Sequence, residues 1–199
     1  MKRKTDVNIF LFDDFETLDI FGPIEVLARA EGYGIKYYSV SGGIIRSAQN
    51  AEILTESIHH ADENGIFVIP GGRGTRPLVN DSESLSVIKK YADLSAYCLS
   101  ICTGSAVLAK CGLLDGRQAT SNKKAFDWVE SIGEKVNWKK KARWCKDGKF
   151  YTSSGVSAGI DMTLGFIADR FGMENAVNIA EDIEYIWNKD SDNDPFERK

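Results

Sequence analysis

The sequence predicts an α/β protein in which a mostly parallel central sheet is covered by helices on both faces. Short apolar runs typical of buried strands alternate with segments of helical periodicity, and this alternation favours a parallel sheet. The connecting loops are short, and no repeat or low-complexity tract divides the chain. With 199 residues, 43% of them hydrophobic, the chain is expected to bury the core of one compact domain.

The first half of the chain supplies most of the expected strands. Residues 6–12 (DVNIFLF) are an apolar run typical of a buried strand. A helix is expected to start at the Gly-Pro pair of residues 22–23, since proline is favoured in a first helical turn. Another helix is expected over residues 81–93, with Asp81 or Ser82 as its cap. The other expected strands are residues 34–40, 44–47 and 52–56 (as a hairpin), 65–70 and 96–101.

The second half adds helices and short strands. A type I′ turn at Asp147-Gly148 joins two of the strands. The expected strands are residues 118–121, 136–138, 142–146 and 149–153, and the expected helices are residues 106–110, 124–132, 157–171 and 174–187. We therefore predict a single domain over residues 1–187 and a polar C-terminal tail over residues 188–199.

A cysteine lies between the strand expected over residues 96–101 and the helix expected over residues 106–110. Such a position is a nucleophile elbow, and the small Gly104 and Ser105 let the backbone turn sharply there. The N-terminus of a helix favours an anion, which here is the reactive thiolate of Cys102. We predict that Cys102 is a nucleophile. The alternative is a buried core cysteine.

Glycines follow the strand expected over residues 65–70. Gly71 and Gly72 should leave their backbone N–H groups unobstructed beside the elbow, with the N–H of Thr103 as a further donor. These groups are predicted to form an oxyanion hole. The segment lacks the sequence of a phosphate loop or of a dinucleotide-binding turn. A plain tight turn is the alternative.

Two carboxyl groups, Glu16 and Asp19, follow the first strand. A carboxyl beside a thiolate becomes harder to ionise, because like charges resist sharing a site. The protonated acid then donates a hydrogen bond to the sulfur or shuttles a proton, so both residues are candidate catalytic groups. The alternatives are a helix cap for Asp19 and a solvated loop carboxylate for Glu16.

A loop of small residues spans positions 153–161. Its small side chains, Gly155 and Ser157 among them, are expected to form a wall of a substrate pocket. Ser157 also fits a plain helix N-cap, so both roles stay open for it.

Composition argues against several classes of partner. The net charge of −4 disfavours nonspecific binding to nucleic acid or to an anionic membrane. No apolar run approaches the roughly 20 residues of a membrane span. The cysteines form no C-x-x-C pair, and the adjacent His59 and His60 make a poor ligand pair, so we expect no metal and no organic cofactor. We read no signal peptide and expect a cytoplasmic protein with free thiols.

Four motifs in order resemble the ThiJ/PfpI superfamily, which has the class I glutamine amidotransferase-like fold. They are T-L-D-x-F-G-P-x-E-V at residues 17–26, P-G-G at 70–72, I-C-T-G-S at 101–105 and S-S-G-V-S-A-G-I-D-M at 153–162. L-D-x-x-G-P and C-T-G-S are most similar to the isonitrile hydratase-like branch. Protease-type members typically have a histidine after the cysteine, where this chain has Thr103.

This resemblance implies a flavodoxin-like doubly wound sandwich, usually a homodimer, with Cys102 as the nucleophile. Asp19 matches the catalytic aspartate position of the hydratase branch. Glu16 matches the protonated glutamate of the redox-sensing and deglycase branch. Asn122 stands where many members have a histidine, and this departure argues against a Cys–His protease or glutaminase mechanism.

The activity implied by the resemblance is a hydratase or lyase that converts an isonitrile and water to an N-substituted formamide. Two alternatives stay open. One is glyoxalase or deglycase activity on reactive dicarbonyls, and the other is a cysteine redox sensor or chaperone-like binder. The same module occurs ahead of AraC-type DNA-binding domains, and this chain is expected to resemble the stand-alone form.

Overall fold

The structure is a computed structural model that describes residues 4–197. The strands are β1 (Thr5–Phe10), β2 (Tyr33–Ser39), β3 (Gly43–Arg46), β4 (Glu52–Ser57), β5 (Ile66–Ile69), β6 (Tyr97–Ser100), β7 (Gln118–Ala119), β8 (Asn137–Trp138), β9 (Trp144–Asp147) and β10 (Phe150–Ser153). The helices are α1 (Thr17–Leu27), α2 (Thr75–Leu78), α3 (Ser82–Leu94), α4 (Gly104–Lys110), α5 (Phe126–Ile132), α6 (Ala158–Phe171) and α7 (Met173–Asp182), with 3-10 turns η1 (Ile58–His60) and η2 (Lys123–Ala125). Residues 1–3 of the predicted domain and residues 198–199 of the predicted tail lie outside the described range.

The large sheet has the order β3-β4-β2-β1-β5-β6-β10-β9. All pairings from β4 to β10 are parallel. Antiparallel hairpins close the two edges, β3 with β4 and β9 with β10. A smaller parallel pair, β7 with β8, forms a separate sheet, and β7 packs beside β9 of the large one. The predicted α/β fold with a mostly parallel central sheet is therefore confirmed.

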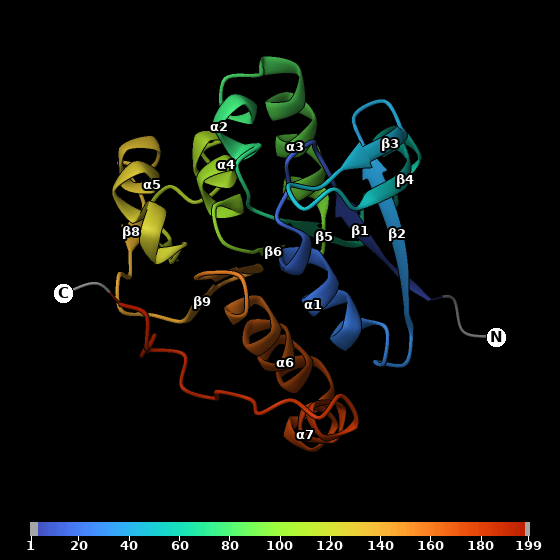
Figure 1. The fold of residues 1–199 in the computed structure, drawn as a ribbon, viewed down its shortest axis with the longest axis vertical. Helices are drawn as coiled ribbons and strands as arrows, with labels where there is room; N and C mark the ends of the chain where they lie inside the picture. The colour runs from blue at the N-terminus through green and yellow to red at the C-terminus, as the bar shows by residue number, and fades with distance from the viewer. Residues whose placement is uncertain (1–3, 198–199) are drawn as a thin grey trace.

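Helices cover both faces of the sheet (Figure 1). Helices α1, α6 and α7 gather on one side, and α2, α3, α4 and α5 gather on the other. The strands β1, β5 and β6 are neighbours and run parallel. Their carboxyl ends therefore meet at one edge, which is where open α/β sheets bind ligands.

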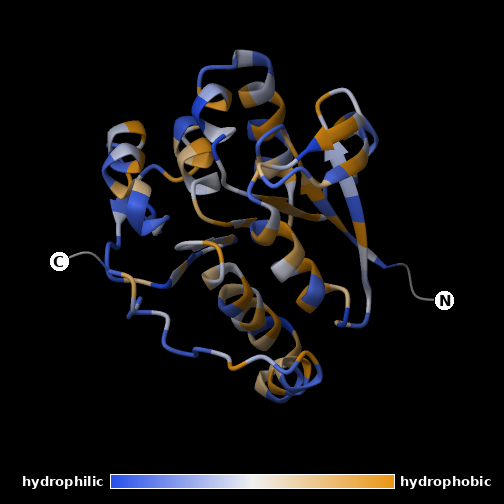
Figure 2. Cartoon of the chain, viewed as in Figure 1, coloured by the Kyte–Doolittle hydropathy of each residue, from blue (hydrophilic) through white to orange (hydrophobic). Residues whose placement is uncertain are grey.

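The core consists of the central strands and the inward sides of the helices. Every residue of β5 is buried, as expected for a strand covered on both faces. Figure 2 shows the hydrophobic colour concentrated on these central strands, with hydrophilic residues on the outer surfaces. Phe10 and Phe67 stack within this layer with ring centroids 6.0 Å apart.

Helix α1 begins earlier than the Gly-Pro pair suggests. Its first residue is Thr17, and Pro23 lies inside the helix. The start is fixed by contacts distant in sequence, because the N–H of Glu16 donates to the carbonyl of Gly71 at 2.9 Å and the Thr17 hydroxyl bonds Ser47 at 2.7 Å. These tertiary hydrogen bonds decide the helix start, and the proline occupies a buried interior position.

Other elements differ from expectation at their ends. Helix α7 stops at Asp182 and not at residue 187, because Glu184 adopts a left-handed φ of 51° and the N–H of Tyr185 bonds the carbonyl of Ala180. The four-residue helix α2 has no helical periodicity and was not expected. The predicted cap of α3 is confirmed, since the Asp81 side chain accepts a hydrogen bond from the N–H of Glu83 at 3.2 Å.

Within residues 188–197 the C-terminal segment is non-helical, as a tail would be, but it is held firmly against the domain. Asp194 is buried, accepts a hydrogen bond from the Ser154 hydroxyl and lies 3.5 Å from Nη1 of Arg143. Arg143 is buried as well, and its Nε donates to Asp161 at 2.7 Å. The C-terminal segment is thus tied through Arg143 to Asp161 in α6 and through Ser154 to the loop before that helix.

We predict that this network contributes strongly to stability. Arg143→Met leaves Asp161 and Asp194 buried without their cation, so the free energy of unfolding should fall by about 3–5 kcal/mol. Urea denaturation followed by circular dichroism measures the loss.

The exposed pair between Lys146 and Asp169, 2.8 Å apart, provides the control. Lys146→Met should cost only about 0–1 kcal/mol, as exposed ion pairs do. Equal losses in the two variants would contradict a special role for the buried network.

Candidate active site around Cys102

Cys102 occupies the sharp turn between β6 and α4. Its φ is 56°, a left-handed conformation that costs a non-glycine residue about 1–3 kcal/mol. The turn also packs closely against the end of β5. A Cβ on Gly104 would lie 2.7 Å from the carbonyl oxygen of Ile69, so only glycine fits there. The predicted elbow geometry is therefore present at this residue.

The thiol of Cys102 is more deeply buried than the sequence suggested. The residue is only 6% exposed. Burial raises the pKa of Cys102, and the negative charge of Asp19 raises it further, while the N–H and hydroxyl of Thr103 and the N–H of Val156 lower it. Burial thus opposes the ionisation that the helix N-terminus is expected to favour, and it is the largest influence on the pKa of the thiol.

Asp19 lies in the first turn of α1 and is fully buried. One carboxyl oxygen accepts a hydrogen bond from the N–H of Gly71 at 2.8 Å, and the other has no partner with hydrogen-bond geometry. Burial raises the pKa of Asp19 well above its usual range. The N–H of Gly71 opposes this, the charge of Glu16 adds to it, and the Cys102 thiol lowers it slightly. Asp19 and Cys102 thus titrate as a coupled pair.

Glu16 takes a different place from Asp19. It is the N-cap residue of α1, its backbone is extended, and its side chain makes no capping hydrogen bond. The residue is half-buried, and its charge acts on Asp19. Of the two carboxyl groups predicted from the sequence, Asp19 is the one whose charge acts on the Cys102 thiol.

The expected oxyanion donors are arranged differently from the prediction. The N–H of Gly71 is taken by Asp19, and the N–H of Gly72 donates to the Thr103 hydroxyl at 3.1 Å. Both glycine N–H groups are therefore obstructed, because the Asp19 carboxyl and the Thr103 hydroxyl already accept their hydrogen bonds. The donors that face the sulfur are the N–H groups of Thr103 and Val156.

The loop before α6 lines a cavity that does not include Cys102 itself but is connected to it through Val156. Gly155 and Ser157, both predicted pocket residues, line a cavity of about 340 Å³ together with Val156 and Phe196. The other lining residues are Asn122, Lys123, Lys124 and Asp194. Val156 therefore connects Cys102 with the cavity. Its N–H faces the Cys102 sulfur, and the residue also lines the cavity. Its φ of 22° is unusual for a β-branched residue, and no sequence pattern signals it.

Asn122, at the position where the resemblance leads one to expect a histidine, caps a short helix. Its side-chain oxygen accepts hydrogen bonds from the N–H groups of Lys124 and Ala125, which caps η2. The histidines lie elsewhere, in η1, where exposed His60 approaches Glu56 at 4.0 Å. In the part of the chain that the structure describes, no group of three or more His, Cys, Asp and Glu side chains is placed to hold a metal ion. No helix among residues 4–197 is both long and apolar enough to cross a membrane.

Comparison with known sequences points to one protein family. The profile of the DJ-1/PfpI family matches residues 5–169. Isonitrile hydratase from Pseudomonas putida is 29% identical over 180 residues, which cover 90% of this chain and 78% of that protein. The HTH-type transcriptional regulator CdhR from Pseudomonas aeruginosa is 28% identical over 184 residues, and the match covers 88% of this chain but only 54% of the regulator.

Solved structures share the same fold. A ThiJ/PfpI family protein from Pseudomonas syringae superposes with a TM-score of 0.85 at 24% identity, over 97% of this chain and 78% of the other. Drosophila melanogaster DJ-1beta superposes with a TM-score of 0.77 at 19% identity, over 92% of this chain and all of the other. The predicted flavodoxin-like sandwich is thereby confirmed.

We predict that Asp19 controls the titration of Cys102. Alkylation of Cys102 by iodoacetamide should be slow at neutral pH and accelerate as the pH rises, because burial and the Asp19 charge raise the pKa of the thiol. Asp19→Asn removes that negative charge, so the pKa of Cys102 should fall and the midpoint of the rate profile should move to lower pH. Peptide mass spectrometry against time gives the profile.

Glu25→Gln is the control, since Glu25 is an exposed carboxylate on the same helix. Its profile should match the wild type. A midpoint that stays in place or rises in Asp19→Asn would contradict the coupling of the two groups.

Proposed function

Because this chain belongs to the DJ-1/PfpI family, we propose that it is a cysteine-dependent hydratase or lyase that acts on a small electrophilic carbon. The specific reaction we propose is that of an isonitrile hydratase, which adds water to an isonitrile and releases an N-substituted formamide. The observation that carries the proposal is that Cys102 and Asp19 are both buried and interact electrostatically; in the proposed reaction Cys102 is the nucleophile and Asp19 the acid. The similarity to isonitrile hydratase supports it.

In the first step the Cys102 sulfur attacks the terminal carbon of the isonitrile. A carbon–sulfur bond forms, and the electron pair of the carbon takes up a proton from the coupled pair. Asp19 is suited to deliver this proton, since burial keeps its carboxyl protonated to higher pH than usual. The product is a thioimidate on Cys102.

In the second step water adds to the thioimidate carbon. Asp19, now ionised, accepts a proton from the water, and a proton is returned to the nitrogen. The carbon–sulfur bond then breaks as the hydroxyl proton of the tetrahedral intermediate passes to Asp19, which releases the formamide and restores the pair with its one proton. The N–H groups of Thr103 and Val156 favour the thiolate form of Cys102, which is the nucleophile of the first step and the leaving group of the second.

The position of Asp19 favours this proposal over the glyoxalase and redox-sensor alternatives. Those alternatives depend on Glu16 as the partner of the cysteine, but it is the charge of Asp19 that acts on the Cys102 thiol. We further propose that the protein acts as a homodimer in the cytoplasm, where its four cysteines stay free.

Turnover of an aliphatic isonitrile tests the proposal. Asp19→Asn should lower the rate of formamide formation by about 10²-fold or more, the usual scale for a positioned acid or base. Cys102→Ser should abolish turnover, because the nucleophile is lost. Gas chromatography of the product measures the rate.

Glu16→Gln is the matched comparison, and it should retain most of the activity because Glu16 lies outside the proposed proton path. Full activity of Asp19→Asn together with an inactive Glu16→Gln would refute the hydratase proposal. A panel that adds methylglyoxal would then test the glyoxalase alternative.

A further inference from the structure

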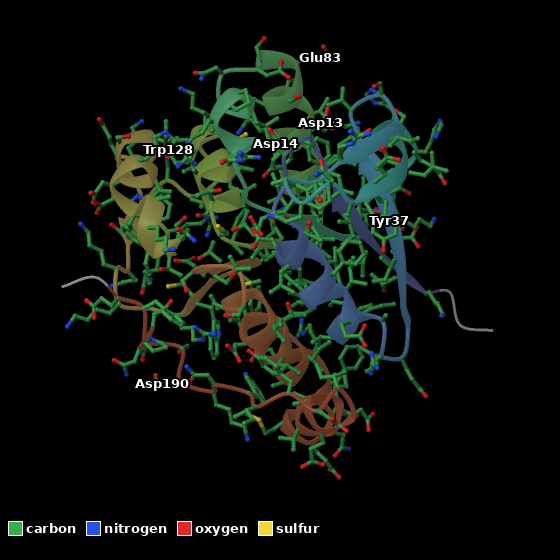
Figure 3. The ribbon with its side chains drawn as sticks, in the orientation of Figure 1. Asp13, Asp14, Tyr37, Glu83, Trp128 and Asp190 are labelled. Atoms are coloured by element: carbon green, nitrogen blue, oxygen red, sulfur yellow. The ribbon has the colours of Figure 1, made fainter. Side chains whose placement is uncertain are left out.

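An arginine beside the elbow is held in an unusual way. Arg76 lies in α2, and its guanidinium stacks on the ring of Trp128, 3.5 Å from the ring centre. Trp128 belongs to α5, which stands next to α4 (Figure 3). A planar guanidinium on an indole face keeps its N–H groups pointing outward from its edge, where they remain available as donors.

Hydrogen bonds connect this arginine to the cysteine turn. Nη1 of Arg76 donates to the Thr75 hydroxyl at 3.3 Å, and that hydroxyl bonds the hydroxyl of Thr103 at 3.1 Å. Thr103 is the residue that follows Cys102. These bonds position the guanidinium relative to the elbow. Burial lowers the pKa of Arg76, and a negative charge on Cys102 opposes that shift, so the two groups interact electrostatically.

The Arg76 side chain is exposed. Among residues 4–197 no Asp or Glu side chain forms an ion pair with its guanidinium. The neighbouring Arg73 on the same connection differs, since it lies 3.6 Å from Asp14. Asp14, labelled in Figure 3, lies in the turn after β1. An oriented and unpaired guanidinium beside a nucleophile is suited to bind an anion, and its planar fork matches a carboxylate.

We propose that Arg76 binds a carboxylate group of the substrate, so that among small electrophiles Cys102 reacts faster with those that carry a carboxylate than with neutral ones. This inference rests on the proposed function, because it names the substrate class for the same cysteine. Arg76 acts as a recognition residue, and Trp128 orients it.

Two alkylating reagents test the inference without any turnover. Iodoacetate and iodoacetamide react alike, since the Cys102 sulfur displaces iodide and forms a carbon–sulfur bond, but only iodoacetate carries a carboxylate. The measured quantity is the ratio of the two rate constants at Cys102, followed by peptide mass spectrometry at low salt. In Arg76→Gln this ratio should fall by about threefold, the scale of an exposed ion pair.

Arg73→Gln is the matched control and should keep the wild-type ratio. Arg76→Lys should retain part of the ratio, because it keeps the charge but loses the planar fork. High salt should lower the wild-type ratio toward that of Arg76→Gln.

An unchanged ratio in Arg76→Gln would overturn the inference. So would an equal fall in both rate constants, since Arg76 would then act only on the thiol. The two proposals can fail independently. If the ratio falls in Arg76→Gln but the wild type does not turn over an isonitrile, only the hydratase proposal is refuted. Normal turnover with an unchanged ratio refutes only the role of Arg76.

Discussion

The close approach of the end of β5 to the turn at Cys102 is the constraint on which the candidate site depends. A Cβ on Gly71 would lie 2.5 Å from the N of Thr103 and 2.8 Å from the Cβ of Cys102, so no side chain fits between the two segments. This contact brings the N–H of Gly71 to Asp19 and holds the carbonyl of Gly71 on the N–H of Glu16. Gly71 thus brings together three segments that are far apart in the sequence, namely the start of α1, the end of β5 and the turn at Cys102.

Burial determines the chemistry of the pair that this contact assembles. A buried carboxyl beside a buried thiol cannot easily carry two negative charges, so the pair retains a proton that either group can deliver. A hydratase needs such a proton in the first step and a base in the second. The backbone donors of Thr103 and Val156 offset part of the cost of charge on the sulfur.

The sequence predicts those features that local rules govern. The α/β class, the turn at Cys102 and the Asp81 cap follow from apolar periodicity, small residues and capping preference. Features that depend on long-range contacts escaped prediction. Pro23 suggests a helix start, but tertiary hydrogen bonds set it at Thr17. The role of Val156 depends on a backbone conformation that its side chain disfavours, so no local pattern indicates it.

The central claim is that Cys102 forms a covalent intermediate with the substrate carbon, which Asp19 helps to convert. Intact-protein mass spectrometry after rapid mixing with an isonitrile tests this claim most directly. The account predicts an adduct of the full isonitrile mass that maps to Cys102 and accumulates in Asp19→Asn, where the hydration step is slowed. An adduct that maps to Cys98, Cys111 or Cys145, or that persists in Cys102→Ser, would contradict it.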